Sequence, residues 1–383
     1  MIYCSTFRSI LHYQYPGLPP AATLAASVDN RILHMRLDIF LRPWALLGCA
    51  GLAACGGTQP TQPAATAPAT TTAVAPAGGP IKVGIALGGG AAKGFAHIGV
   101  IKMLEANGFA PAVVSGTSAG SVVGALYASG MNAFEMQEKA VALDEAKIRD
   151  LQLSSGGLVL GQKLEDYVNE QVRRKPLEQM AKPFVVVATR LEDGERTVFA
   201  RGNTGQAVRA SSSVPGVFQP VSIGKYHFVD GGIVSPVPVD AARQLGADIV
   251  IAVDISNKAR GQTPGNMLGA LNQSIAIMGQ KLGEAELARA DVVIRPKVLD
   301  IGPADFSQRA SAIVEGEKAA LAVMPQIRER IAQLQAERAR AAQLTQQKAQ
   351  EAEHKACLDN RSRLQRLAGL AGMGEGCPAP ATR

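Results

Sequence analysis

The serine at position 118 is the residue of this chain best suited to act as a nucleophile. It lies in the motif Gly116-Thr117-Ser118-Ala119-Gly120, between two apolar runs. This order predicts a strand, a tight turn and a helix, and the small residues around the serine let the chain turn sharply enough to present its hydroxyl. N–H groups at the start of the helix would face whatever the serine oxygen attacks. The pentapeptide alone is also compatible with an ordinary turn rich in small residues.

A glycine-rich loop precedes the serine motif and could bind a negatively charged group. Its sequence is Gly88-Gly89-Gly90-Ala91-Ala92-Lys93-Gly94, between a strand-like run and a helical pattern. The N–H groups of such a loop form a nest for an anion. A dinucleotide would need an acidic residue about 20 residues further on, a nucleoside triphosphate would need Gly-Lys-Ser or Gly-Lys-Thr, and neither is present. An oxyanion hole fits best, because the next strand ends in the serine turn.

The third candidate is an aspartate that ends a strand-like run. Asp230 follows Tyr226-His227-Phe228-Val229 and precedes Gly231 and Gly232, at the edge where open α/β sheets place their chemistry. An ordinary Asp-Gly turn is the alternative. None of the five histidines is well placed to assist the serine. His227 precedes the aspartate, His354 lies in a polar tail, and His97 is interpreted as a packing or capping residue. Asp230 itself therefore becomes the predicted base.

In this order the motifs resemble those of the patatin-like phospholipases, in particular their bacterial members. The segment 210–221 is also similar to the one that precedes the family's aspartate, and the resemblance covers residues 81 to about 255. Two positions depart from the family pattern. Ala91 stands where the family usually has glycine, and Lys93 stands where it usually has arginine. Lysine keeps the positive charge but lacks the planar fork of arginine.

The resemblance implies a serine hydrolase that cleaves carboxylic esters of phospholipids or lysophospholipids through an acyl-serine intermediate. Ser118 would attack the carbonyl while Asp230 takes its proton, and Asp230 would then activate a water molecule. Apolar surroundings should raise the pKa of Asp230 and strengthen it as a base. Neither a metal ion nor a cofactor is expected. The predicted oxyanion hole comprises Gly88, Gly89, Gly90, Ala91, Lys93 and Gly94, with the N–H groups of Gly89, Gly90 and Ala91 as donors and that of Ala119 as an additional one.

Two other functions remain open at this point. The first is a general carboxylesterase for small soluble esters, which would use the same two residues. The second is a non-catalytic envelope lipoprotein whose fold serves as a scaffold, against which the intact Ser118, Asp230 and glycine loop argue. A serine peptidase is disfavoured, because no histidine is available to protonate a leaving amine.

The elements around the motifs predict a three-layer α/β/α sandwich with a mostly parallel central sheet, as the resemblance also implies. Apolar strand-like runs alternate with helical patterns, which is typical of a parallel sheet covered by helices on both faces. We assign residues 81–318 to this catalytic domain. Residues 319–383 are rich in Ala, Gln, Arg, Glu and Lys and predict a polar helical tail. The stretch 150–161 is a candidate lid. The later strands are expected at 184–189, 196–199, 248–254 and 291–296.

The N-terminal part predicts export as a bacterial lipoprotein. Residues 35–54 have a basic start, a short apolar core and small residues before Cys55, the layout of a secretory signal with a lipobox. Cleavage before Cys55 would leave that cysteine for lipid attachment, at the outer membrane and facing the periplasm. Residues 1–34 precede the signal and are interpreted as a mis-called extension. Residues 55–80 would be the lipidated cysteine and a flexible linker rich in Pro, Ala and Thr.

The charge and the cysteines agree with an exported protein at a membrane. The net charge of +7 favours contact with anionic lipid surfaces. Aromatic residues make up only 4% of the chain, so platforms for stacking nucleic-acid bases are few and no nucleic-acid partner is expected. Cys357 and Cys377 could pair in an oxidising compartment. The oligomeric state is left open.

Overall fold

The computed structural model describes residues 79–148, 150–154, 157–256, 258, 265, 267–368 and 377. The predicted extension 1–34, the predicted signal 35–54 and Cys55 lie outside the described residues, as does most of the predicted linker. The fold below is therefore that of the predicted catalytic domain and tail.

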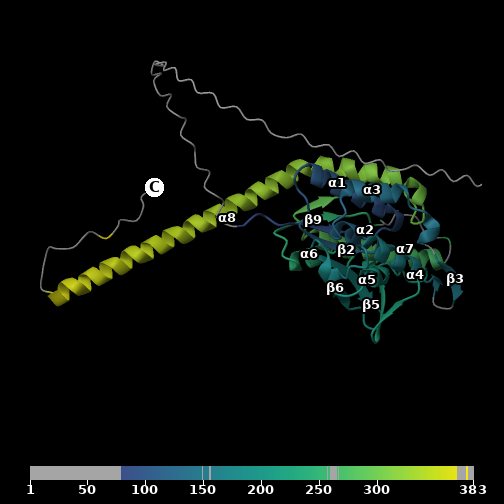
Figure 1. The fold of residues 1–383 in the computed structure, drawn as a ribbon, viewed down its shortest axis with the longest axis horizontal. Coiled ribbons are helices and arrows are strands. Elements are labelled where there is room, and N and C mark those ends of the chain that lie inside the picture. Colours follow the sequence, from purple (N-terminus) through teal and green to yellow (C-terminus); the bar gives the residue numbers. More distant parts are fainter. Residues whose placement is uncertain are drawn as a thin grey trace, which may run out of the picture. The chain divides into compact units, whose positions relative to one another are not determined.

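A mixed sheet forms the middle layer of the fold (Figure 1). Within the described residues it has eight strands in the order β10-β9-β1-β2-β5-β8-β7, with β6 paired to β5. The first five strands of that order are parallel, and β6, β7 and β8 run antiparallel to their neighbours. The predicted, mostly parallel sheet is confirmed. The strands are β1 Val83–Leu87, β2 Val113–Thr117, β5 Phe184–Arg190, β6 Arg196–Phe199, β7 Val221–Ile223, β8 Tyr226–Asp230, β9 Ile249–Val253 and β10 Val292–Ile294.

Helices cover both faces of this sheet. The α-helices are α1 Phe95–Ala106, α2 Ala119–Ala128, α3 Ala133–Val141, α4 Gln162–Gln171, α5 Thr204–Ser211, α6 Val239–Gln244, α7 Met267–Leu287 and α8 Arg309–Ala368. Short 3-10 turns are η1 Ala91–Gly94, η2 Glu145–Lys147, η3 Leu177–Gln179, η4 Gly231–Ile233 and η5 Phe306–Gln308. A separate hairpin pairs β3 Leu151–Ser154 with β4 Gly157–Val159.

The alternation of side chains along the strands separates two cores. Ile85 of β1 and Ile251 of β9 are buried in the core that includes α1, α2 and α8. Their neighbours Ala86 and Val250 belong to a second core, with α6 and the end of α7. Successive residues of a strand point to opposite faces, so β1 and β9 contribute to both cores. The predicted three-layer α/β/α arrangement is confirmed.

The C-terminal helix begins inside the domain rather than after it. Helix α8 is continuous through the predicted boundary between residues 318 and 319, and its first part packs against α1 (Figure 1). Ile313, Met324 and Ile327 are buried there. A Cβ atom on Gly99 would lie 1.9 Å from the Ile313 carbonyl oxygen, so the two helix backbones touch. Helix α8 therefore crosses the predicted boundary, and its apolar stripe forms part of the core.

The distal part of α8 is polar, as predicted. Beyond Arg338 its described side chains are mostly exposed. A disulfide joins Cys357 to Cys377, the two cysteines whose pairing the sequence left open. None of the described helices combines the length and the apolar character needed to cross a membrane.

Candidate active site

Ser118 occupies the turn between β2 and α2 in an unusual backbone conformation. Its φ is +53° and its ψ is −125°, and a positive φ is strained for a residue with a side chain. Gly120 allows this turn, since a Cβ there would lie 2.1 Å from the Leu87 carbonyl oxygen. Ser211 supports the turn, because its Oγ accepts a 2.8 Å hydrogen bond from the Ser118 N–H and donates one to the Val187 carbonyl. The predicted strand, turn and helix around Ser118 are confirmed.

The register of the sheet places Asp230 beside this turn. On β5, Val187 is paired with Thr117 of β2, and the next residue, Ala188, is paired with Asp230 of β8. Strand β2 is parallel to β5 and β8 is antiparallel, so their carboxyl ends approach each other from opposite directions. A Cβ on Gly231 would lie 3.1 Å from the Thr117 side chain, so the two ends are in contact. The sheet thus brings Ser118 and Asp230, which are far apart in the sequence, close together.

Asp230 is held in place by its backbone and by one carboxylate oxygen. Its N–H donates to the Ser213 carbonyl at 2.9 Å, and its own carbonyl accepts from the Thr189 hydroxyl at 2.8 Å. Its Oδ1 accepts a 2.7 Å hydrogen bond from the Gly232 N–H. Its Oδ2 has no hydrogen-bond partner among the described residues. One oxygen therefore orients the carboxylate and the other is available for chemistry.

Burial controls the charge of this carboxylate. It raises the pKa of Asp230 to about 6, against the opposing effects of the Ser118 hydroxyl and the Gly232 N–H. The expected rise in pKa is confirmed, and its cause is desolvation of the charged form. The Ser118 hydroxyl is near enough to oppose that rise, although no direct hydrogen bond joins Ser118 and Asp230 in this structure. A carboxylate with this pKa is ionised at neutral pH yet basic enough to take a proton.

The glycine loop lies against the serine turn, but its N–H groups are used unequally. Those of Gly88 and Gly89 donate to carbonyls of β9 and of the segment after Asp230, at 3.0 Å each. Those of Gly90 and Ala91 have no acceptor among the described residues. The predicted set of oxyanion donors is therefore corrected: Gly88 and Gly89 anchor the loop, because neighbouring elements supply acceptors for them. The N–H groups of Gly90 and Ala91 remain available.

The two departures from the family pattern differ in their structural consequences. Ala91 has a φ of +52°, a conformation that glycine adopts without strain, which explains why glycine is usual at this position. Lys93 is fully buried in η1 and does not line the cavity described below. Gly94 and Ala119 do line it. Lys93 is therefore buried within the glycine loop and does not lie at the surface of the cavity.

His97 anchors the same loop from helix α1. Its Nε2 lies 2.8 Å from the Gly88 carbonyl oxygen. Burial lowers the pKa of His97 to about 4, so the ring is neutral at physiological pH and donates this hydrogen bond through Nε2. The interpretation of His97 as a packing or capping residue is confirmed. His227 is exposed and pairs with Glu192, so neither ring assists Ser118.

An apolar cavity of about 530 Å³ opens at Ser118. Its walls come from the glycine loop, α1, α2, α4 and the segment that follows α5. Val159, from the hairpin in the candidate lid, also lines it, and the Val159 N–H donates to the Val217 carbonyl at 3.0 Å. Volumes of this size hold small organic ligands, and an apolar lining favours the hydrocarbon part of a ligand. Other lining side chains include Phe95, Ile98, Val122, Leu126, Met136, Leu164, Tyr167, Ser212, Phe218 and Phe306.

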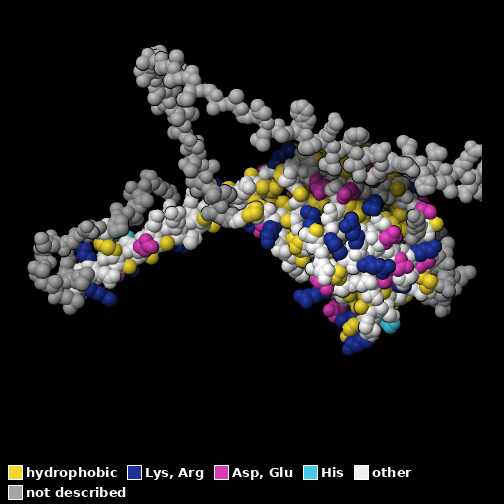
Figure 2. Space-filling view, in the orientation of Figure 1, with side chains coloured by type: hydrophobic (Ala, Val, Ile, Leu, Met, Phe, Trp, Pro, Cys, Tyr) yellow, Lys and Arg dark blue, Asp and Glu magenta, His cyan; other side chains and the backbone are white. Residues whose placement is uncertain are grey.

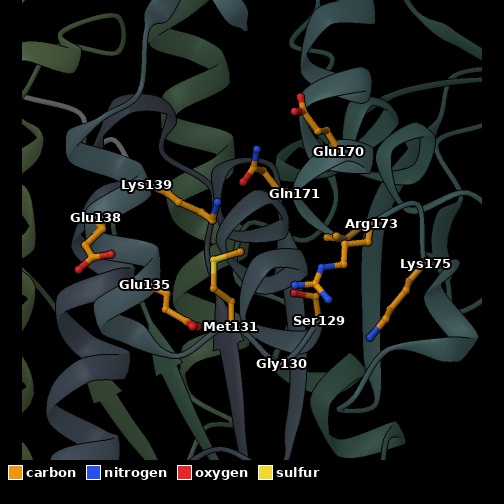
Figure 3. Close-up of a pocket in the computed structure, with 11 residues that line it drawn as sticks. Ser129, Gly130, Met131, Glu135, Glu138, Lys139, Glu170, Gln171, Arg173 and Lys175 are labelled. Atoms are coloured by element: carbon orange, nitrogen blue, oxygen red, sulfur yellow. The ribbon is translucent and has the colours of Figure 1, made fainter. Parts of the chain in front are cut away.

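A second cavity, of about 540 Å³, is polar and lies at the other end of α2 (Figure 3). Ser129 and Gly130 form its base, and cationic and acidic side chains line it in equal number. None of the predicted site residues lines it. The equal numbers of positive and negative side chains favour neither anionic nor cationic ligands. Because Ser118 lines the apolar cavity and not this one, the apolar cavity is the candidate active site. The charged lining residues are Lys139, Arg173, Lys175, Glu135, Glu138 and Glu170.

The central part of the chain is similar to known proteins. Residues 85–243 match the patatin-like phospholipase family. An uncharacterized NTE family protein of Mycobacterium tuberculosis is 35% identical over 182 residues, which cover 47% of this chain and 51% of that protein. Lysophospholipase NTE1 of Pyricularia oryzae is 26% identical over 279 residues, which cover 64% of this chain and 19% of that protein. The chain thus spans about half the length of the mycobacterial relative.

The heterodimeric complex ExoU-SpcU from the type III secretion system of Pseudomonas aeruginosa gives a TM-score of 0.39 at 18% sequence identity. The alignment covers 77% of this chain and 67% of that chain.

Proposed function

We propose, from the premise that residues 85–243 form a patatin-like phospholipase domain, that this protein is a lipid acyl hydrolase with a Ser118–Asp230 dyad. The observation that carries the proposal is the meeting of the two residues. Ser118 directly follows Thr117, the last residue of β2, and Asp230 ends β8. Thr117 and Asp230 are paired with consecutive residues of β5, and Ser118 lines an apolar cavity. A nucleophile, a base and a hydrocarbon site thus lie in one place. The substrates are carboxylic esters of phospholipids or lysophospholipids.

In the first step Ser118 becomes acylated. Its Oγ forms a bond to the ester carbonyl carbon and its proton passes to Asp230, whose Oδ2 has no hydrogen-bond partner among the described residues. The negative charge that develops on the carbonyl oxygen is stabilised by the N–H groups of Gly90 and Ala91, with that of Ala119 as a further donor. The tetrahedral intermediate then breaks its bond to the alcohol oxygen. The departing alcohol takes the proton back from Asp230.

In the second step water releases the acyl group. Asp230 takes a proton from water, whose oxygen bonds to the acyl carbon while the same N–H groups hold the negative charge. The bond to Ser118 Oγ then breaks, and Ser118 recovers its proton from Asp230. The products are a fatty acid and the unmodified enzyme, so no metal ion or cofactor enters the balance.

Acyl-chain preference should distinguish a lipid hydrolase from a general carboxylesterase. Each buried methylene contributes about 0.8 kcal/mol, so the apolar cavity should favour longer acyl chains. We expect kcat/KM for nitrophenyl esters to rise on the order of 100-fold between four-carbon and eight-carbon chains. We also expect fatty-acid release from lysophospholipid or phospholipid micelles. The measurement is the initial rate for each ester in the same buffer.

The opposite result would favour the alternative function. A kcat/KM that is flat or falls with chain length, together with no release from phospholipid or lysophospholipid, would identify a carboxylesterase for small esters. The relative named as a lysophospholipase supports the lipid substrate.

We also propose that the protein is exported and anchored to the bacterial outer membrane through a lipid on Cys55. The pairing of Cys357 with Cys377 supports export, because disulfides persist in oxidising compartments such as the periplasm. Replacing Cys55 with serine should move the full-length protein from the membrane fraction to the soluble fraction. The matched control is Cys49→Ser, which removes a cysteine of the predicted signal core and should leave the protein with the membranes. Retention of the Cys55→Ser protein in the membrane fraction would contradict the lipid anchor.

A further inference from the structure

Glu286 is a buried carboxylate that the proposed reaction does not use. It lies near the end of α7, beyond the family match of residues 85–243, and is only 5% exposed. Within the described residues no Lys or Arg forms an ion pair with it, and nearby Arg289 is bonded to Asp240. Burying a carboxylate is unfavourable unless hydrogen bonds compensate for the lost water. The partners of Glu286 therefore indicate what the residue does.

Both oxygens of Glu286 hold one short segment, residues 235–237. Oε1 accepts a hydrogen bond from the Ser235 hydroxyl, and Oε2 accepts one of 2.8 Å from the Val237 N–H. Hydrogen bonds to an ionised group are stronger than those between neutral groups. The segment begins four residues after Gly231. Its residue Val237 and Leu287, the neighbour of Glu286, belong to the core on the sheet face opposite α1 and α2.

The segment 235–237 in turn contacts each part of the proposed site. The Ser235 carbonyl accepts a 2.8 Å hydrogen bond from the hydroxyl of Thr117, the residue before the nucleophile. The Pro236 carbonyl accepts the 3.0 Å bond from the glycine-loop residue Gly89. The Ser235 N–H donates to the Gly231 carbonyl at 2.8 Å, next to Asp230. One segment thus touches the serine turn, the oxyanion loop and the turn after the base.

We infer that Glu286 is a positioning residue for the hydrolase: by clamping residues 235–237 it sets the relative geometry of Ser118, Asp230 and the glycine loop. This inference rests on the proposed function. It adds helix α7, which lies outside the family match, to the elements on which activity depends. Small displacements of reacting groups are enough to matter, since a misplacement of about 1 Å can lower a rate about 100-fold.

The test compares two substitutions at Glu286 in the full-length protein. Glu286→Leu fills a similar volume but removes both acceptors, and we expect kcat for a short soluble ester to fall about 10- to 100-fold while KM changes little. Glu286→Gln can accept from the Val237 N–H and donate to the Ser235 hydroxyl, which is able to accept. The glutamine variant should therefore retain most of the wild-type kcat. Burial raises the pKa of Glu286 to about 7, so a neutral side chain is tolerated there.

Other outcomes would overturn the inference. A folded Glu286→Leu protein with the wild-type kcat would exclude a positioning role, as would a glutamine variant as impaired as the leucine variant. If Glu286→Leu does not fold, Ser235→Ala, which removes one of the two bonds, replaces it: a lower kcat supports the inference and an unchanged kcat refutes it. The proposed function is judged separately, because its failure would leave the wild-type protein itself without ester hydrolysis.

Discussion

Replacing Ser118 with alanine should abolish ester hydrolysis. The substitution removes the atom that forms the acyl intermediate, and removal of a serine nucleophile costs on the order of 10⁶-fold in kcat in the best-studied hydrolases. The backbone at this position has a φ of +53° in either variant, so the fold should persist. Covalent labelling by a fluorophosphonate probe should also disappear. The measurement is probe labelling and ester turnover of the wild type and the variant, with thermal melting as the test of folding.

Ser212 provides a matched control for this experiment. It lines the same cavity and its side chain is buried, but no step of the proposed reaction uses it. Ser212→Ala should retain probe labelling, whereas Ser118→Ala should lose it. Labelling of the Ser118→Ala protein would assign the nucleophile elsewhere. A folded wild-type protein that takes up no probe would instead favour the non-catalytic lipoprotein.

Replacing Asp230 with asparagine should remove activity and stabilise the fold. An amide cannot take the Ser118 proton, so we expect a loss of about 1,000-fold or more in kcat/KM, within the range for removal of an essential acid–base group. Burial raises the pKa of Asp230 from 3.8 to about 6, so the folded state opposes ionisation of this group. The penalty for the ionised carboxylate is on the order of 3 kcal/mol. Asparagine carries no charge and avoids it.

Because the pKa of Asp230 is higher in the folded state than in the unfolded state, the stability difference between the wild type and Asp230→Asn depends on pH. Below pH 3.8 the group is protonated in both the folded and the unfolded state, so the wild type and the variant should be similar in stability. As pH rises from 3.8 to about 6 the unfolded state ionises first, and the wild type loses stability relative to Asp230→Asn. Above about pH 6 the difference should be constant. Denaturant titrations at about pH 4, 5, 6 and 8 resolve this curve.

Asp291 is a control with the opposite sign. Burial tends to raise its pKa, but hydrogen bonds from Val250 and Arg330 and the charge of Arg243 outweigh burial and lower it. Asp291→Asn should therefore destabilise the protein at neutral pH, where Asp230→Asn stabilises it.

The wild-type kcat/KM should rise through about pH 6 as Asp230 ionises. Near-normal activity of Asp230→Asn, or a profile without that rise, would contradict the role of Asp230 as base.

The local structure around Ser118 and Asp230 could be predicted because its signals are local. The glycine spacing around Ser118 permits a sharp turn whatever surrounds it, and the positive φ at Ser118 agrees with that reading. Asp230 ends an apolar run before two glycines, which predicts a strand end and a turn. The alternation of apolar runs and helical patterns was enough to predict the layered fold.

The sequence by itself therefore determined the turn that carries Ser118, the strand that ends in Asp230 and the class of fold. Tertiary structure decided which loop N–H groups are available, because the partners of Gly88 and Gly89 come from segments about 150 residues later. It also decided that Ser118 and Asp230 lie near each other, because Thr117 and Asp230 pair with consecutive residues of β5. Tertiary structure also decided the packing of α8 on α1 and the hydrogen bonds of Glu286 to residues 235–237. Such contacts depend on which distant backbones and side chains the fold brings together, and no local pattern of residues records them.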